Sequence, residues 1–338
     1  MKKVTLALFS IALLLWAHPS FSQDDEKESR YKRFKYFKEN KLSKSYPSGS
    51  YQLSIENSFG DVKFIAGTTN EIKVDVQWEA SSDNEEQANK NFEAIKIDNK
   101  QEGNKISFVT SVKSKDDKNN CKNCKTSLRI DYVVQLPVTV PVTVENSFGK
   151  IVLPDYKGTL SITSKFGEVN AGNLQDVKKF DVEFGEAEVG SLSNVSASVK
   201  FGSISLKSLS GKNKLNMEFC GKSQIGLASN MESLELKESY SVVNLRPASN
   251  LSASYSISTN FGSVKDRANI GITRIDKPEK YGPDAQQKHA GKTGSGNAQI
   301  NIKSDFGTII LGEPQAGDLD DKKSKNKNKN KNKNRVTT

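Results

Sequence analysis

Histidine is nearly absent from this chain of 338 residues, which holds only His18, near its start, and His289, in a Gly-rich stretch. A serine–histidine or cysteine–histidine triad, or a metal site with several histidines, would have to rest on His289. The sequence therefore argues against these kinds of catalysis. It predicts no catalytic, cofactor-binding or metal-binding residue, and no cofactor.

Long apolar runs are also scarce. The prominent one, Val4 to Trp16, follows Lys2-Lys3 and precedes Ser20-Phe21-Ser22, which offers small residues at a cleavage site. This pattern predicts a signal peptide over residues 1–22 and an exported protein of the periplasm or cell surface. The run is shorter than the roughly 20 residues that span a bilayer, so no transmembrane span is expected after cleavage.

Cysteine is limited to three residues. Cys121 and Cys124 stand in a polar loop, and in an oxidising compartment such a pair is a candidate disulfide. A zinc site needs four ligands and a thioredoxin-like site needs a strand-to-helix context, and neither is present around this pair. The third, Cys220, occupies a repeat position that predicts a buried packing residue.

The formal net charge of +10 is concentrated at the chain ends. The tract from Lys322 to Arg335 carries +8, residues 23–44 carry +3 and the leader +2, which leaves −3 for residues 45–321. A folded body so close to neutral lacks the basic face that nucleic acid requires, so we expect no nucleic-acid partner. The alternating Lys/Asn tract predicts either a solvated tail or contact with an anionic envelope surface.

An internal repeat is the most informative feature of the sequence. An aromatic residue, usually followed by Gly, recurs at spacings of 18, 18, 17, 18, 21 and 21 residues from Phe148 to Phe261. Further copies stand on either side of this series. The full set is Phe59, Phe148, Phe166, Phe184, Phe201, Phe219, Tyr240, Phe261 and Phe306.

Apolar residues recur at +3, +5 and near +8 from each aromatic residue, and a second alternating set precedes the next one. Short period-2 runs broken by Gly, Asn, Ser and Asp are typical of strands and turns. Stacking such units at about 4.8 Å would align equivalent positions in a continuous core. We therefore expect an all-β fold, a single-stranded β-helix-like β-solenoid with coils of about 18–21 residues.

The repeat also predicts local roles. We expect the aromatic rings to stack inside the core, and each following Gly to allow a bulge or a positive φ at the corner. The residues directly before the rings, Lys165, Glu183, Lys200 and Glu218, alternate in sign and would form a charge ladder on a solvated face.

The segment before the repeats differs from them. Its strands alternate clearly, and a capping box from Ser82 to Glu85 predicts one short helix that covers an open end of the sheet. The predicted division, with its five segments, is a signal peptide at 1–22, a basic and aromatic linker at 23–46, an N-terminal β-rich capping segment with the helix at 47–140, solenoid repeats at 141–312 and a disordered Lys/Asn-rich tail at 313–338.

The paired Glu-Asn-Ser-Phe-Gly motifs ending at Gly60 and Gly149, the Phe-Gly series, and the closing strand from Gly294 to Ile309 resemble the putative adhesin family of secreted bacterial β-strand-repeat proteins. The resemblance covers residues 47–312. It implies a right-handed β-solenoid outside the cytoplasm, and it supplies no catalytic residues.

Three functional hypotheses follow. The first is a non-catalytic envelope protein, adhesin-like, that offers a binding surface or scaffold to an unknown protein or polysaccharide. The second is a carbohydrate-active β-helix enzyme, a lyase or hydrolase, that uses outward carboxylates such as Glu168, Glu186 and Glu188. The third is a periplasmic sensor or regulatory partner. The absence of Arg between Arg129 and Arg246 disfavours the enzyme.

Overall fold

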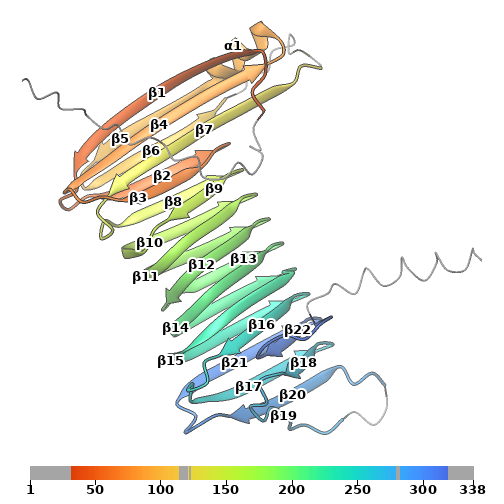
Figure 1. The fold of residues 1–338 in the computed structure, drawn as a ribbon. Helices are drawn as coiled ribbons and strands as arrows, with labels where there is room; N and C mark the ends of the chain where they lie inside the picture. The colour runs from red at the N-terminus through yellow and green to blue at the C-terminus, as the bar shows by residue number, and fades with distance from the viewer. Residues whose placement is uncertain (1–31, 114–120, 122, 279–281, 319–338) are drawn as a thin grey trace, which may run out of the picture. The chain divides into compact units, whose positions relative to one another are not determined.

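A computed structural model describes residues 32–113, 121, 123–278 and 282–318, and the described residues from Arg33 onward belong to one compact unit. Within the described part the fold is mostly β, with one α-helix, and twenty-two strands belong to one hydrogen-bonded network (Figure 1). None of the residues described there forms a helix long and apolar enough to cross a membrane. The predicted signal peptide and the tract from Lys322 to Arg335 lie outside the described residues.

Most of the unit consists of strand–turn–strand repeats, which we call rungs. In each rung one strand precedes an aromatic residue and another follows it, and each strand pairs in parallel with its equivalent in the next rung. The preceding strands form the first row: β2 (Gln52–Ser58), β8 (Val142–Ser147), β10 (Tyr156–Lys165), the ends of β11 (Glu168–Glu183), β14 (Ser203–Glu218) and β15 (Lys222–Ser239), β13 (Ser196–Lys200), β21 (Ala298–Asp305) and β17 (Ala253–Asn260). The second row contains β3 (Val62–Ala66), β9 (Lys150–Leu153), β12 (Glu186–Ser193), β16 (Val242–Pro247), β22 (Thr308–Leu311), β18 (Ser263–Asp266) and the beginnings of β11, β14 and β15.

Three strands are long enough to contribute to both rows. β11 and β14 each begin in the second row and end in the first, and the register of β14 against β15 shifts around Gly211, whose φ is 71°. The pairings β11–β12, β12–β14, β14–β13 and β13–β11 consequently form a closed ring of four strands, with the other strands stacked outside it.

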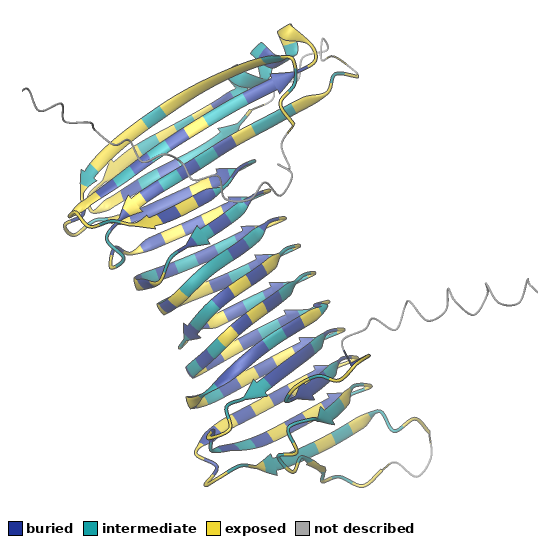
Figure 2. Ribbon diagram, viewed as in Figure 1, coloured by how far each residue is buried: buried dark blue, intermediate teal, exposed yellow. Residues whose placement is uncertain are grey.

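A single hydrophobic core fills the space between the rows. The positions that the sequence predicted to point inward are buried, from Ile151 and Val169 after the aromatic residues to Phe180 and Val182 before the next one, and Ala171 is half-buried. Figure 2 shows the resulting alternation of buried and exposed residues along the strands. Cys220 is buried as expected, and burial raises the pKa of its thiol.

At the N-terminal end both rows continue into longer strands. β6 (Lys105–Val112) extends the first row and pairs antiparallel with β5 (Ile95–Glu102). β7 (Thr126–Leu136) extends the second row, followed by β4 (Glu71–Ser82) and β1 (Tyr36–Pro47), both antiparallel. The prediction of a linker over 23–46 is therefore wrong from Tyr36 onward, where β1 pairs with β4.

The predicted helix is present as α1 (Glu85–Ala94) and contacts β1, β4 and β5, strands of both rows. Its N-cap is Asn84, whose side chain accepts a hydrogen bond from the backbone N–H of Gln87 at 2.9 Å. Ser82, the cap expected from the sequence, instead accepts from the N–H of Asn84 and donates to the carbonyl of Lys125. Both side chains satisfy backbone groups at the helix start, and the N-cap lies two residues later than the sequence predicts.

The C-terminal rungs are not stacked in sequence order. β21 inserts between β15 and β17, and β22 inserts between β16 and β18. The chain leaves β18, forms β19 (Thr273–Arg274) and β20 (Gln286–Lys292), and then returns. Because β20 runs antiparallel to β17, it covers the edge of the first row.

The segment after β22 folds back over the second row. Asp318 is nearly buried and its carboxylate accepts from Lys265 at 2.8 Å and from Arg267 at 3.0 Å. These two cations hold the pKa of Asp318 well below its usual range. Residues 313–318, which the sequence assigned to the disordered tail, are thus part of the ordered fold.

Candidate functional site

A continuous row of stacked aromatic rings runs along one edge of the rungs, and we call it the aromatic ladder. Neighbouring ring centroids lie 4.7–5.3 Å apart, and neighbouring ring planes differ by only 1–9°. Its members, in spatial order, are Phe59, Phe148, Phe166, Phe184, Phe201, Phe219, Tyr240, Phe306 and Phe261. The structure brings together every repeat residue that the sequence singled out, with the last two in exchanged order.

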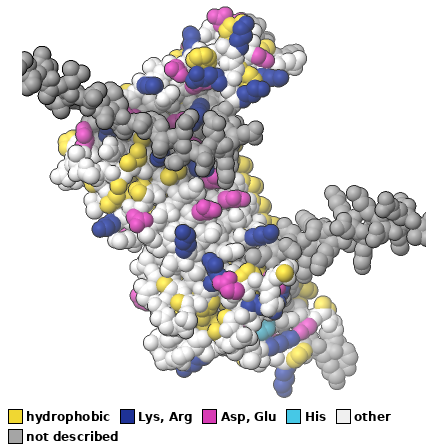
Figure 3. All heavy atoms as spheres, in the orientation of Figure 1, with side chains coloured by type: hydrophobic (Ala, Val, Ile, Leu, Met, Phe, Trp, Pro, Cys, Tyr) yellow, Lys and Arg dark blue, Asp and Glu magenta, His cyan; other side chains and the backbone are white. Residues whose placement is uncertain are grey.

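The ladder lies on the surface, so its predicted place in the core is wrong. Phe59 is half-buried, and the other eight rings are between 44% and 54% exposed. Figure 3 shows hydrophobic side chains in a row along one edge of the molecule. The rings stack on one another, as predicted, but they stack outside the two rows of strands.

Backbone geometry explains the exposure. All nine ladder residues adopt a left-handed conformation, with φ between 51° and 66°, which turns the side chain outward at the corner between the rows. For residues other than Gly this conformation costs about 1–2 kcal/mol. Of the two alternatives predicted for the following Gly, a bulge or a positive φ, the positive φ is not found there, because the aromatic residue itself adopts it.

The Gly after the ring is required for a different reason. A Cβ on Gly149, Gly167, Gly185 or Gly202 would overlap the carbonyl oxygen of the preceding rung's Gly. The backbones of neighbouring rungs thus approach too closely for any side chain at this position.

The arrangement limits the ligands that the ladder can take. Both faces of every ring between the two ends of the ladder are covered by neighbouring rings, and a spacing near 5 Å leaves no room for another ring to enter. Sugar rings or planar bases cannot stack on the covered faces. The ladder can instead present a line of ring edges to an apolar surface.

Charged residues flank the ladder on both sides. The residues directly before the rings form the leading column, which includes Lys165, Glu183, Lys200 and Glu218, and these four align across neighbouring strands as predicted. Lys200 and Glu218 make an ion pair of 3.2 Å. The first outward residues after the rings form the trailing column, which includes Lys150, Glu168, Glu186 and Lys222.

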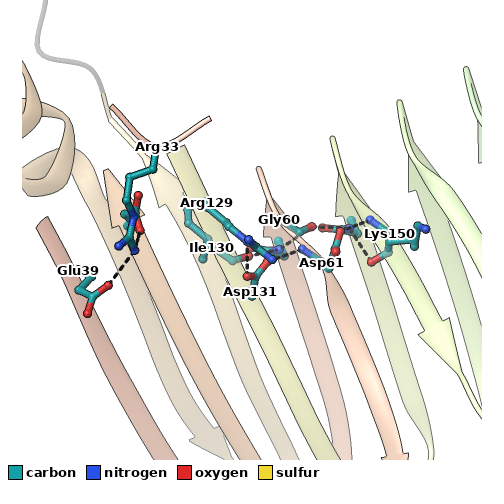
Figure 4. Close-up of polar contacts among 11 residues, drawn as sticks. Arg33, Glu39, Gly60, Asp61, Arg129, Ile130, Asp131 and Lys150 are labelled. Carbon is teal, nitrogen blue, oxygen red and sulfur yellow. Dashed lines mark hydrogen bonds and ion pairs between the residues drawn. The ribbon is translucent and has the colours of Figure 1, made fainter. Parts of the chain in front are cut away.

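The trailing column is continuous with a polar network near the N-terminal end, drawn in Figure 4. The N–H of Lys150 donates to Asp61 at 2.7 Å, and the N–H of Asp61 donates to Asp131 at 3.0 Å. Arg129 pairs with Asp131 at 2.6 Å. Burial nevertheless raises the pKa of Asp131. These contacts fix the strand ends beside the first rings.

A buried carboxylate lies beneath the ladder. Glu238 stands two residues before Tyr240, is 3% exposed, and accepts from the hydroxyl of Ser304 and from the N–H of Ser241 at 3.2 Å. Burial, with a smaller contribution from the nearby charge of Asp305, raises its pKa to about 7 despite these hydrogen bonds. In the first rungs the equivalent position, two residues before the ring, is occupied by Asn57 and Asn146. Their side-chain amides donate to backbone carbonyls.

We expect Glu238 to make stability depend on pH. Because the folded state raises the pKa of Glu238 from 4.5 to about 7, its contribution is fully present below about pH 4.5 and is lost as pH rises through 7. Glu238→Gln keeps a neutral acceptor, so the unfolding free energy of the variant should exceed that of the parent at pH 8, by roughly 2–3 kcal/mol. Urea unfolding at pH 5 and pH 8 measures this.

The control for this prediction is Glu235→Gln, on the same strand, whose side chain is 57% exposed. It should leave the pH dependence as in the parent. A Glu238→Gln variant with the parent's pH dependence would contradict the assignment.

The outward carboxylates proposed for an enzyme lie along the stacked strands, and their neighbours are residues of adjacent rungs. Glu168 and Glu186 are neighbours in register, but Glu168 is paired with Lys150 at 3.0 Å, and Glu188 lies beside Asn170 and Ser205. A hollow of about 280 Å³ lies elsewhere, and its lining includes Lys207, Gly226, Arg246 and Glu313.

The structure also locates the cysteine pair and the histidine that the sequence singled out. Cys121 and Cys124 are joined by a disulfide, with Cα atoms 5.5 Å apart. His289 lies on β20, and burial lowers the pKa of its imidazole. No group of three or more potential metal ligands occurs within the described ranges.

Sequence reasoning missed the exposure of the rings, although the sequence contained a signal for it. The inward positions at −2 and +3 from most rings are an odd number of residues apart, so the alternation must break between them. A ring at such a break belongs to a corner and not to a strand face. Glu238 gave a weaker signal, as the one acid at a −2 position.

No protein-family model matches the chain, and no curated protein matches it by sequence. Among solved structures, it is similar to a putative cell adhesion protein from Clostridium sporogenes, with 16% identity, a TM-score of 0.26 and coverage of 82% of this chain and 100% of that one. A putative adhesin from Bacteroides fragilis has 10% identity, a TM-score of 0.38 and coverage of 80% and 97%. A putative lipid binding protein from Parabacteroides distasonis has 9% identity, a TM-score of 0.29 and coverage of 81% and 97%. At these values the comparison assigns no family and transfers no residue role.

Proposed function

We propose that this protein is an exported, non-catalytic binding protein, a β-solenoid of the adhesin-like kind whose aromatic ladder is the binding surface. One observation carries the proposal: eight large apolar rings remain about half exposed, at positions where the backbone disfavours them. Gly or Asn would occupy a left-handed corner at lower cost. Strained residues concentrate where function requires them.

The size of the apolar surface supports binding. Half exposure of eight rings gives roughly 700–800 Å² of aromatic surface, whereas the largest apolar patch of a typical monomer is about 300–600 Å². A surface of this size is unfavourable in water unless a partner covers it for part of the time. Stacking between rings explains their regular spacing but leaves their outer edges exposed.

The outward carboxylates favour a non-catalytic role over the carbohydrate-active alternative. Glu168 is held by Lys150, and the covered ring faces cannot stack on sugar rings. Export and contact of the tract from Lys322 to Arg335 with an anionic surface remain parts of the proposal that rest on the sequence.

Binding by the full chain can be tested with beads that carry the protein. The panel of targets contains envelope polysaccharide, vesicles of phosphatidylethanolamine and phosphatidylglycerol, and a second set of beads that carries the same protein. The triple variant Phe166→Asn, Phe184→Asn and Phe201→Asn removes three rings with a residue that tolerates left-handed φ. We expect at least about tenfold weaker binding to the target that the parent binds.

Phe37→Asn is the matched control, because Phe37 is an exposed ring on β1 outside the ladder. This variant should bind like the parent. Equal binding by the triple variant and the parent, with both folded, would remove the ladder from the proposal.

A further inference from the structure

We propose that the partner of the aromatic ladder is a second copy of this chain, bound ladder against ladder with the two ladders antiparallel. This inference rests on the proposed function and names its ligand. It makes the protein a homophilic binder, in which copies from one surface or from two surfaces join along their exposed rings.

The available area fits a dimer. The ladder extends about 40 Å, with successive centroids 4.7–5.3 Å apart. Its rings expose roughly 700–800 Å², close to the roughly 800 Å² that each partner contributes to a typical stable interface. A flat apolar partner could cover the same area, so area alone does not choose the occupant.

The repeat distance favours a second copy. Ring edges that recur every 5 Å form a ridge with a fixed period, and only a partner with the same period meets every rung in the same way. Another copy has that period by construction. Under two-fold symmetry each favourable contact between different residues occurs two times, as in most homodimers.

The charges beside the ladder select the antiparallel arrangement. A two-fold axis between Phe184 and Phe201, perpendicular to the ladder, makes the leading columns of the two copies face each other in opposite directions. Glu183 then faces Lys200 of the second copy, and Lys165 faces Glu218 of the second copy. On the other side of the ladder, Glu168 faces Lys222 of the second copy. Every charged pair formed among these six residues of the two columns is of opposite sign.

Other symmetric arrangements are less favourable. A two-fold axis through Phe201 brings Lys200 against Lys200 of the second copy, and Glu183 against Glu218 of the second copy. A parallel dimer brings the leading column against the trailing column. Lys165 then meets Glu168 of the second copy and Glu218 meets Lys222, but Glu183 meets Glu186. The parallel dimer therefore has two pairs of opposite sign and one of like sign, whereas the antiparallel dimer has three of opposite sign. Both place like charges together, which lowers affinity and suppresses that pairing.

The experiment uses sedimentation equilibrium on the full chain and on two charge variants. Lys165→Glu with Lys200→Glu makes these leading-column positions all acidic, and Glu183→Lys with Glu218→Lys makes them all basic. The parent should dimerise. Each variant alone should self-associate at least about tenfold more weakly, and an equal mixture of the two should recover the dimer.

Lys179→Glu with Lys214→Glu is the control, because it reverses charges on first-row strands away from the ladder. It should dimerise like the parent, and thermal melting establishes that every variant is folded. A mixture that stays monomeric overturns the antiparallel arrangement. A monomeric parent whose bead binding to polysaccharide or vesicles still needs Phe184 overturns self-association and keeps the proposed function. Unchanged dimerisation of the triple Asn variant overturns the ladder-to-ladder contact.

Discussion

Replacing Gly167 by alanine is expected to destabilise the protein by about 3 kcal/mol or more, enough to lower its yield of folded material. The added Cβ would overlap the carbonyl oxygen of Gly149 in the preceding rung, with further close contacts to the same residue's backbone. A backbone atom cannot rotate away as a side chain can, so the rungs must separate and weaken the parallel pairing on both sides. Chemical unfolding of the variant, followed by circular dichroism, measures the loss.

Gly221→Ala is the matched control. Gly221 also follows a ladder residue closely, but a Cβ there would meet nothing within 4 Å. Its unfolding free energy should stay within about 0.5 kcal/mol of the parent. If both alanine variants have the same stability, the close approach of the rung backbones does not explain why Gly follows the rings.

Phe180→Ala is expected to cost about 3–5 kcal/mol, because its ring is completely buried between the rows. Phe184→Ala, four residues later, should cost only about 1–2 kcal/mol, since its ring is 44% exposed and its loss removes mainly the stacking on Phe166 and Phe201. This is less than the 3–5 kcal/mol that a core position for Phe184 would imply. Thermal or urea unfolding of both variants gives the two values.

Phe184→Gly refines the comparison. Gly removes the same ring but also relieves the left-handed strain, so this variant should be at least as stable as Phe184→Ala. A cost for Phe184→Ala equal to that for Phe180→Ala would mean that the ladder rings are buried after all.

Much of the fold was predictable because the repeat applies one rule many times. The alternating residues around Phe166 and Phe184 specify which side chains are buried, and equal spacing specifies which strands are neighbours. Stacking of the rings follows from the same register. The mostly β content and the single helix near Asn84 follow from local signals.

The remainder depends on information that is not local. Period-2 alternation indicates which residues share a face, but it does not indicate which way a corner residue turns. The sequence therefore predicts the ladder rings in the core, whereas they lie on the surface. Sequence order suggested that Phe261 would follow Tyr240 in the stack, whereas Phe306 lies between them. The contact between Glu238 and Ser304 depends on that insertion and could not be found without it.

The insertion of β21 and β22 has a consequence for how the stack is completed during synthesis. Rungs up to Tyr240 can join in the order in which the chain is made, but β17 and β18 reach their final neighbours only after residues 298–311 exist. Until then, the ends of β15 and β16 have open edges, β18 lacks the strand it pairs with, and β17 can pair only with β20. Residues 298–311 therefore complete the stack by inserting between strands that are made earlier. A chain that lacks them ends in unpaired strand edges, the kind of surface that promotes aggregation.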